Sequence, residues 1–126
     1  MKKFVSLLVV SLFLVSCSST AGVNNLSAEE FLAKSQEPNV VVLDVRTSGE
    51  FAAGHLANAI NIDVEAGDFD SEISKLDKSL IYAVYCRSGR RSEIASEKMS
   101  KSGFKNIFNL EGGGFQNLAE LGAPTS

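Results

Sequence analysis

The sequence lacks the features of several specialised protein classes. It has no heptad pattern, no collagen period and no internal repeat of about 20 to 50 residues, which excludes coiled coils, collagens and solenoids. It also has no long basic run, and its 12 basic and 15 acidic residues give a net charge of −3. We therefore expect no nucleic acid as a main partner. With 44% hydrophobic residues, the chain of 126 residues is too apolar for disorder and suits one globular domain.

No apolar run is long enough to cross a bilayer stably, which takes about 20 residues. The longest, from Phe4 to Val15, has 12 residues and follows Lys2 and Lys3. This pattern is typical of a signal peptide, predicted over residues 1–16, with an uncleaved membrane anchor as the alternative. The rest of the chain then carries 10 basic and 15 acidic residues, a net charge of −5.

The segment from Leu14 to Cys17 (LVSC) resembles a bacterial lipobox. The resemblance implies cleavage before Cys17, a diacylglycerol on its sulfur and an acyl chain on its amine, so that lipid holds the protein on a membrane. Ser18 resembles an outer-membrane sorting signal, which implies the periplasmic face of the outer membrane in a cell with two membranes. We expect an extracytoplasmic lipoprotein in which residues 17–26 are the lipidated cysteine and a flexible tether.

Residues 27–126 alternate predicted helices with short apolar strands. Strands are expected at residues 40–45, 59–62, 80–85 and 106–110, and helices at 27–34, before Gly54, over 68–76, before Gly103 and at 115–121. Unbroken apolar strands are typical of sheets buried on both faces. The alternation predicts an α/β fold with a parallel β-sheet flanked by helices on both faces. In such sheets ligands bind beyond the carboxyl ends of the strands, and Cys86 follows one of these ends.

The chain has only two cysteines, Cys17 and Cys86, and we expect them to have different roles. If Cys17 is lipidated, Cys86 has no intramolecular partner, which excludes a disulfide framework. A lone thiol is a liability in an oxidising compartment. Cys86 is therefore either an inert buried side chain or a working thiol.

The segment that Cys86 opens joins a predicted strand to a predicted helix. It reads Cys86-Arg87-Ser88-Gly89-Arg90-Arg91. Amides at a helix N-terminus lack intrahelical partners, Gly89 permits tight curvature, and three arginines add positive charge. Such surroundings commonly lower a cysteine pKa from about 8.5 to about 3.5–7.5, and the same donors bind an anion. We interpret the segment as a cradle for an anionic substrate with Cys86 as nucleophile, which requires a thiolate that solvent can reach. The alternative is solvated arginines around an inert Cys86.

Three parts of the sequence resemble the motifs of single-domain rhodaneses. They are LDVRTSGEFAAGHL at 43–56 with AINI at 59–62, CRSGRRS at 86–92, and NLEGG at 109–113. The resemblance implies a rhodanese-like domain over residues 27–126 that transfers sulfane sulfur from an anionic donor such as thiosulfate to cyanide or a thiol. It implies no metal and no organic cofactor. One departure is Asn117, where the family usually has Trp, and Phe115 or Leu118 is expected to fill that packing site.

The resemblance also implies roles for individual residues. Cys86 would attack the donor and carry its sulfur as a persulfide. The arginine side chains of Arg90 and Arg91 would attract the donor. The backbone amides that would hold the persulfide belong to Arg87, Ser88, Gly89, Arg90 and Arg91.

Four other polar residues are expected to be structural. Asp44, Arg46 and Glu50 would form a network that ties a strand end to the following turn. His55, the only histidine, would make a structural hydrogen bond, since a thiolate already formed at neutral pH needs no general base.

Three rival functions stay open. A cysteine-dependent phosphatase or arsenate reductase would carry Arg six positions after the cysteine, where this chain has Ser92. A loop one residue shorter should crowd phosphate yet admit a sulfur atom. The domain would otherwise be a non-catalytic binding module, or a persulfide carrier for a partner protein. A monomer is expected in each case.

Overall fold

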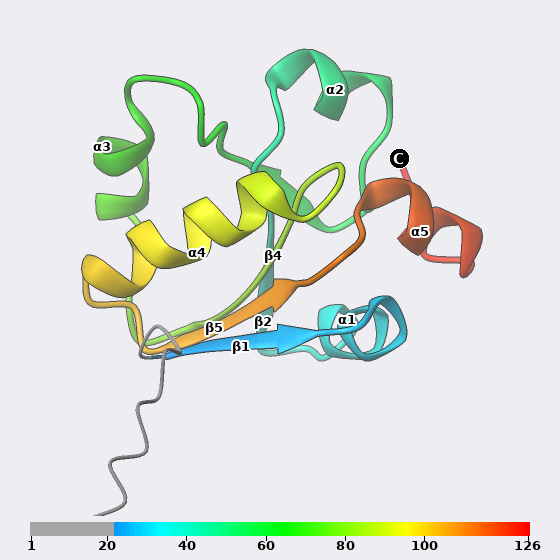
Figure 1. The fold of residues 1–126 in the computed structure, drawn as a ribbon, viewed down its shortest axis with the longest axis horizontal. Coiled ribbons are helices and arrows are strands. Elements are labelled where there is room, and N and C mark those ends of the chain that lie inside the picture. Colours follow the sequence, from blue (N-terminus) through cyan, green and yellow to red (C-terminus); the bar gives the residue numbers. More distant parts are fainter. Residues whose placement is uncertain (1–21) are drawn as a thin grey trace, which may run out of the picture.

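A computed structural model of the protein describes residues 22–126, in which short strands and helices alternate along the chain (Figure 1). The elements are β1 (Val23–Leu26), α1 (Ala28–Ser35), β2 (Val40–Asp44), α2 (Ser48–Ala53), β3 (Ala59–Asn61), α3 (Phe69–Ser74), β4 (Ile81–Tyr85), α4 (Arg90–Lys101), β5 (Asn106–Leu110) and α5 (Phe115–Glu120). The strands form one sheet in the order β1-β5-β4-β2-β3, and every neighbouring pair is parallel. The predicted α/β class with a parallel sheet is confirmed.

Apolar side chains pack on both faces of the sheet, as the unbroken strands predict. Along β4, Tyr82 and Val84 belong to one buried cluster, whereas Ala83 and Tyr85 belong to the other. Helices α3 and α4 cover the first cluster, which contains Phe69 and Met99 among others, and α1 and α5 cover the second. Because each face of β4 is covered, the end of this strand is held firmly, and Cys86 follows it directly.

Local signals begin and end two of the helices. Ser27 caps α1 and exchanges hydrogen bonds with Glu30, a capping box that the sequence predicts. Helix α4 ends before Gly103, whose φ of 98° is the left-handed conformation common after a helix C-terminus. Both boundaries agree with the prediction to within one residue or two.

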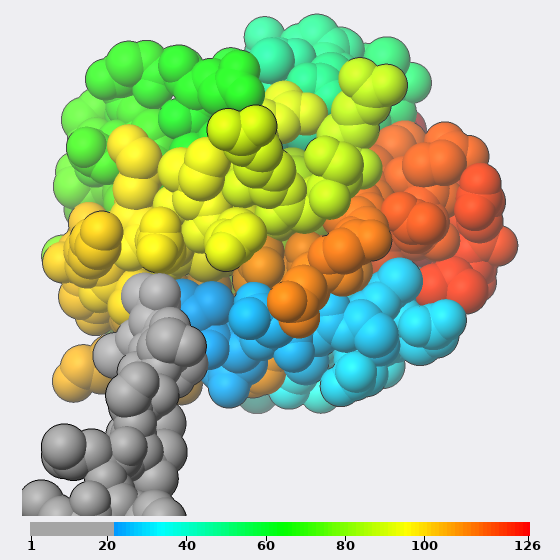
Figure 2. All heavy atoms as spheres, in the orientation of Figure 1, coloured from blue at the N-terminus to red at the C-terminus, as the bar shows by residue number. Residues whose placement is uncertain are grey.

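The predicted tether is wrong in its last part, because Val23–Leu26 is a strand. This strand, β1, pairs with β5 in the register Val23↔Ile107 to Leu26↔Leu110 and lies at the surface beside it (Figure 2). The sequence VNNL has little apolar character, so propensity does not predict a strand there. The pairing comes from the open edge of β5 and from Asn25, whose Oδ1 accepts a hydrogen bond of 3.0 Å from Asn109. The folded domain therefore begins before residue 27.

The predicted signal peptide of residues 1–16 and the predicted lipidation of Cys17 lie outside the described residues. Among residues 22–126, no helix combines the length and the apolar character needed to cross a membrane.

Candidate active site

Residues 86–91, called the Cys86 loop below, form the turn after β4 and the first two residues of α4, at the carboxyl edge of the sheet (Figure 1). Gly89 precedes α4 with a φ of 98°, which a residue with a Cβ rarely adopts. In this conformation the amide of Gly89 donates a hydrogen bond of 3.0 Å to the Sγ of Cys86. The strand, the cysteine and the helix N-terminus therefore meet as the sequence predicts.

The backbone of Gly114 and Phe115, at the start of α5, packs against the Cys86 loop. The amide of Phe115 donates a hydrogen bond of 2.9 Å to the carbonyl oxygen of Cys86. A Cβ on Gly114 would overlap the carbonyl group of Arg87, so only glycine allows the two backbones to approach this closely. Gly114, which follows NLEGG, thus has a packing role against the loop.

The surroundings of the Cys86 thiol have opposite effects on its pKa. Burial raises the pKa, because a thiolate loses its hydration in the core. Hydrogen bonds from the hydroxyl and amide of Ser92 and from the amides of Ser88 and Gly89 stabilise the thiolate. Together they outweigh burial, so the pKa of Cys86 lies below its ordinary value.

Ser92 was not among the expected site residues. Its hydroxyl is buried and lies 3.0 Å from the carbonyl oxygen of Gly89, so its single proton bonds this oxygen or the thiolate at any one time. The signal for Ser92 in the sequence is its place in the first turn of α4, where side chains point back toward the helix N-terminus.

The thiol is closed off from solvent, which the sequence did not predict. Cys86 is 0% exposed and belongs to the apolar cluster between the sheet and α4. The interpretation as a nucleophile requires a sulfur that a substrate can reach. In this conformation a donor reaches Sγ only after the groups around it move.

The three arginines of the Cys86 loop differ in their partners. Arg91 is half-buried, and its Nη1 and Nη2 lie 2.7 and 3.0 Å from the two carboxylate oxygens of Glu50. The attraction of a donor by Arg91 stays a prediction, and in this conformation Glu50 occupies the guanidinium. Arg87 and Arg90 are exposed, like Ser88, and neither arginine has an ion-pair partner within residues 22–126.

Glu50 differs from its predicted role, because it bonds to α4 rather than to Arg46. The hydrogen bond from Arg91 holds the pKa of Glu50 down, at about 2, although partial burial opposes this effect. Glu50 also completes a capping box with Thr47 at the start of α2. Glu50 is thus ionised at every physiological pH, and it connects α2 with the Cys86 loop.

The other two members of the predicted network do pair with each other. Asp44 and Arg46 are both buried, and the guanidinium binds both carboxylate oxygens, at 2.9 Å and 2.6 Å. The Arg46 guanidinium also donates to the carbonyl oxygen of Gly54 at 2.7 Å, which holds the end of α2. The Tyr85 hydroxyl donates to Asp44 at 2.8 Å, and burial raises the pKa of Tyr85. Asp44 and Arg46 thus form the ion pair that the sequence predicts, and Arg46 also lies in the wall of the cavity beside α2.

His55 makes the kind of contact that the sequence predicts. Its Nδ1 lies 2.8 Å from the carbonyl oxygen of Phe51, and its ring stacks on the Phe51 ring with centroids 3.6 Å apart. The backbone amide of His55 bonds the carbonyl oxygen of Ser126. These contacts fix the turn after α2 to the end of the chain.

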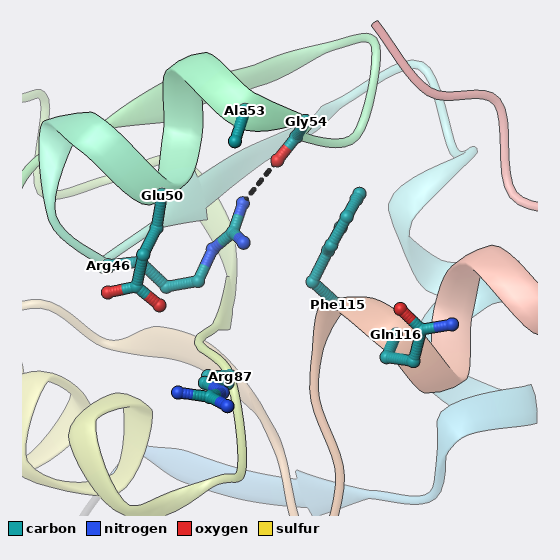
Figure 3. Close-up of a pocket in the computed structure, with 7 residues that line it drawn as sticks. All are labelled: Arg46, Glu50, Ala53, Gly54, Arg87, Phe115 and Gln116. Atoms are coloured by element: carbon teal, nitrogen blue, oxygen red, sulfur yellow. Dashed lines mark hydrogen bonds between the residues drawn. The ribbon is translucent and has the colours of Figure 1, made fainter.

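Two cavities flank the Cys86 loop. The first, of about 270 Å³, lies between α2, Arg87 and the start of α5, with Glu50, Ala53, Phe115 and Gln116 in its walls (Figure 3). The second, of about 240 Å³, lies against β1 and β5. Its walls include Ser88, Arg90, Asn109 and Glu111. Within the described part of the chain, no three His, Cys, Asp or Glu side chains gather as metal ligands would.

A family comparison agrees with this geometry. A model of the rhodanese-like domain family matches residues 27–119. The chain belongs to the rhodanese-like family. Solved structures agree: a rhodanese-related protein from Thermoplasma volcanium is 32% identical, with 82% of this chain and 97% of that chain covered and a TM-score of 0.70. The rhodanese-like domain of an Anabaena protein is 26% identical, with 81% and 77% covered and a TM-score of 0.70.

Curated relatives of this rhodanese-like domain carry a different name. A tRNA uridine(34) hydroxylase from Cytophaga hutchinsonii is 38% identical over 92 residues, which are 71% of this chain and 30% of the relative. The hydroxylase of the same name from Chlamydia trachomatis is 35% identical over 104 residues, 78% of this chain and 32% of the relative. The chain thus spans about a third of their length. Their names refer to tRNA, whereas the charge pattern led us to expect no nucleic-acid partner.

The departure at Asn117 has a local explanation. Leu118 is fully buried in the cluster beneath α5, and Phe115 is half-buried at the first cavity, so Leu118 provides the core contact. The side chain of Asn117 accepts a hydrogen bond of 2.9 Å from the Gly114 amide and caps α5. A polar residue at 117 is therefore compatible with the fold and leaves the Cys86 loop in place.

We expect Ser92→Ala to raise the pKa of Cys86, because it removes one donor to the thiolate. The midpoint should rise by about one pH unit, the value of a single charge-assisted hydrogen bond. The ultraviolet absorbance of the thiolate measures this midpoint directly.

Ser96→Ala is the matched control for this measurement. Ser96 is a buried serine one turn further along α4, and its hydroxyl has no hydrogen-bond partner among the described residues. The control should leave the midpoint unchanged. Equal midpoints for Ser92→Ala and the unmodified protein would contradict the role given to Ser92.

Proposed function

We propose that this rhodanese-like domain is a sulfurtransferase with Cys86 as its nucleophile. The observation that supports it most directly is the Gly89 amide 3.0 Å from a Sγ whose pKa is lowered. The thiolate attacks the outer sulfur of thiosulfate, a new S–S bond forms on Cys86, the S–S bond of thiosulfate breaks, and its electron pair leaves with sulfite. Cyanide then takes the outer sulfur and leaves as thiocyanate, or a thiol takes it as a persulfide, and Cys86 returns to thiolate.

The charges and donors around the Cys86 loop suit an anionic donor of this kind. Arg87 and Arg90 are exposed cations, and Arg87 lies at the first cavity beside α2. Backbone amides at the start of α4 point toward Sγ, and they would stabilise the negative outer sulfur of a persulfide as they stabilise the thiolate. The chemistry draws only on the thiolate and these donors.

The covalent intermediate provides the test of this proposal. After incubation with thiosulfate, mass spectrometry of the intact protein should record a gain of one sulfur atom, ~32 Da, as expected for a nucleophile that holds the transferred group. Cys86→Ser should abolish the gain while its circular dichroism stays unchanged. An unmodified mass after thiosulfate and after 3-mercaptopyruvate would favour a non-catalytic binding module instead, with which the closed thiol is also compatible. A mass gain without turnover to cyanide or thiols would favour a persulfide carrier.

A second candidate function comes from the names of the curated relatives. Because the chain spans about a third of proteins named tRNA uridine(34) hydroxylase, it would act in tRNA modification as one part of such an activity. This candidate requires that tRNA bind, with an affinity that falls steeply as salt rises. In an electrophoretic mobility assay with tRNA, a salt-dependent shift would favour it. Sulfur transfer, by contrast, should proceed at the same rate with and without tRNA.

We also propose that Cys17 is lipidated and anchors the protein to a membrane. The support is the LVSC segment after the short apolar run of residues 4–15. Cys17→Ala should move the protein from the membrane fraction to the carbonate wash. A variant that stays with the membranes would mean that another feature anchors it.

A further inference from the structure

We propose that Glu50 occupies the place on Arg91 that the anionic sulfur donor takes, so that the donor opens the site by displacing this carboxylate. The role of the donor rests on the sulfurtransferase proposal, whereas the closure of Cys86 by the ion pair does not. Glu50 then determines both how readily a donor reaches Cys86 and how tightly the donor binds.

The geometry of the ion pair is that of an anion already bound. Both oxygens of Glu50 meet the guanidinium of Arg91, at 2.7 and 3.0 Å. A planar guanidinium binds carboxylate, sulfate-like and phosphate-like oxygens through the same pair of N–H groups. An oxyanion donor and Glu50 therefore compete for the same two donors.

The pKa of Arg91 responds to the charge on Cys86. Arg91 lies five positions after Cys86 in the first turn of α4, and an ionised Cys86 raises the pKa of Arg91, after the larger effect of Glu50. Cys86 itself is 0% exposed. The ion pair therefore joins α2 to the first turn of α4, next to the turn in which Cys86 is buried.

Helix α2, which carries Glu50, is the element around the site that is most easily displaced. None of its six residues is buried, so few apolar contacts hold it on the domain. Its end is held by the hydrogen bond from Arg46 to Gly54 (Figure 3). The ion pair between Glu50 and Arg91 holds the side nearer the loop. The cavity of about 270 Å³ beneath it provides room for movement. Loss of the ion pair would let α2 swing about its end near Gly54.

Glu50→Gln separates this role from the capping role of the same side chain. Glutamine preserves the capping box with Thr47, because both Glu and Gln form capping boxes. It removes the negative charge of the carboxylate. We expect Cys86 to react with neutral iodoacetamide about 2- to 5-fold faster, the factor that a partly exposed ion pair can supply. The KM for thiosulfate should fall by a similar factor with little change in kcat.

Two further variants keep the proposal open to refutation. Glu93→Gln removes a negative charge from the exposed side of the first turn of α4 and should behave as the unmodified protein in both assays. Arg91→Lys keeps the charge but not the bidentate geometry, so it should speed alkylation without lowering the KM. An unchanged alkylation rate in folded Glu50→Gln, or an equal increase in Glu93→Gln, would overturn the proposal. Because alkylation needs no turnover, faster alkylation without any sulfur transfer would support the closure by Glu50 and refute the sulfurtransferase proposal.

Discussion

The hydrogen bond between the Gly89 amide and the Sγ of Cys86 is the interaction on which the chemistry of this domain depends. It exists because β4 ends at Tyr85 in the core and α4 begins at Arg90, so that only four residues turn the chain. The turn needs a left-handed residue, and glycine provides it at position 89. Burial alone would leave Cys86 a protonated, inert thiol, whereas the amides of the turn lower its pKa.

The same packing that lowers the pKa of the Cys86 thiol also encloses it. Donors must lie within hydrogen-bond distance of Sγ to stabilise the thiolate, and Cys86, which packs among them and the apolar cluster, is buried. The sulfurtransferase proposal requires a neighbouring element that moves to admit the donor. Helix α2 meets this requirement, because its six residues contribute nothing to the core and polar contacts hold it at both ends. The apolar contacts of the sheet and the polar contacts of α2 therefore come from different parts of the chain.

Much of the fold could be predicted from local sequence. Four of the five strands agree with their predicted positions, because runs such as VVVLD and IYAVY admit no other common structure in a chain of alternating elements. The exception is β1, whose VNNL sequence resembles a loop and whose conformation comes from pairing with β5. The site was predicted in the same uneven way. Cys86, Gly89 and the Asp44–Arg46 pair were recognised, but the partner of Arg91 was not.

The sequence by itself determined the family, the α/β order of elements and the position of Cys86 between a buried strand and a helix, since each follows from residues close together in the chain. Only the tertiary structure decided that Cys86 is buried from solvent, that β1 belongs to the sheet and that Glu50 binds Arg91. Glu50 and Arg91 are 41 positions apart, and Val23 and Ile107 meet across most of the domain. Such contacts depend on how helices and strands pack together, and local preferences of the backbone carry no information about that packing.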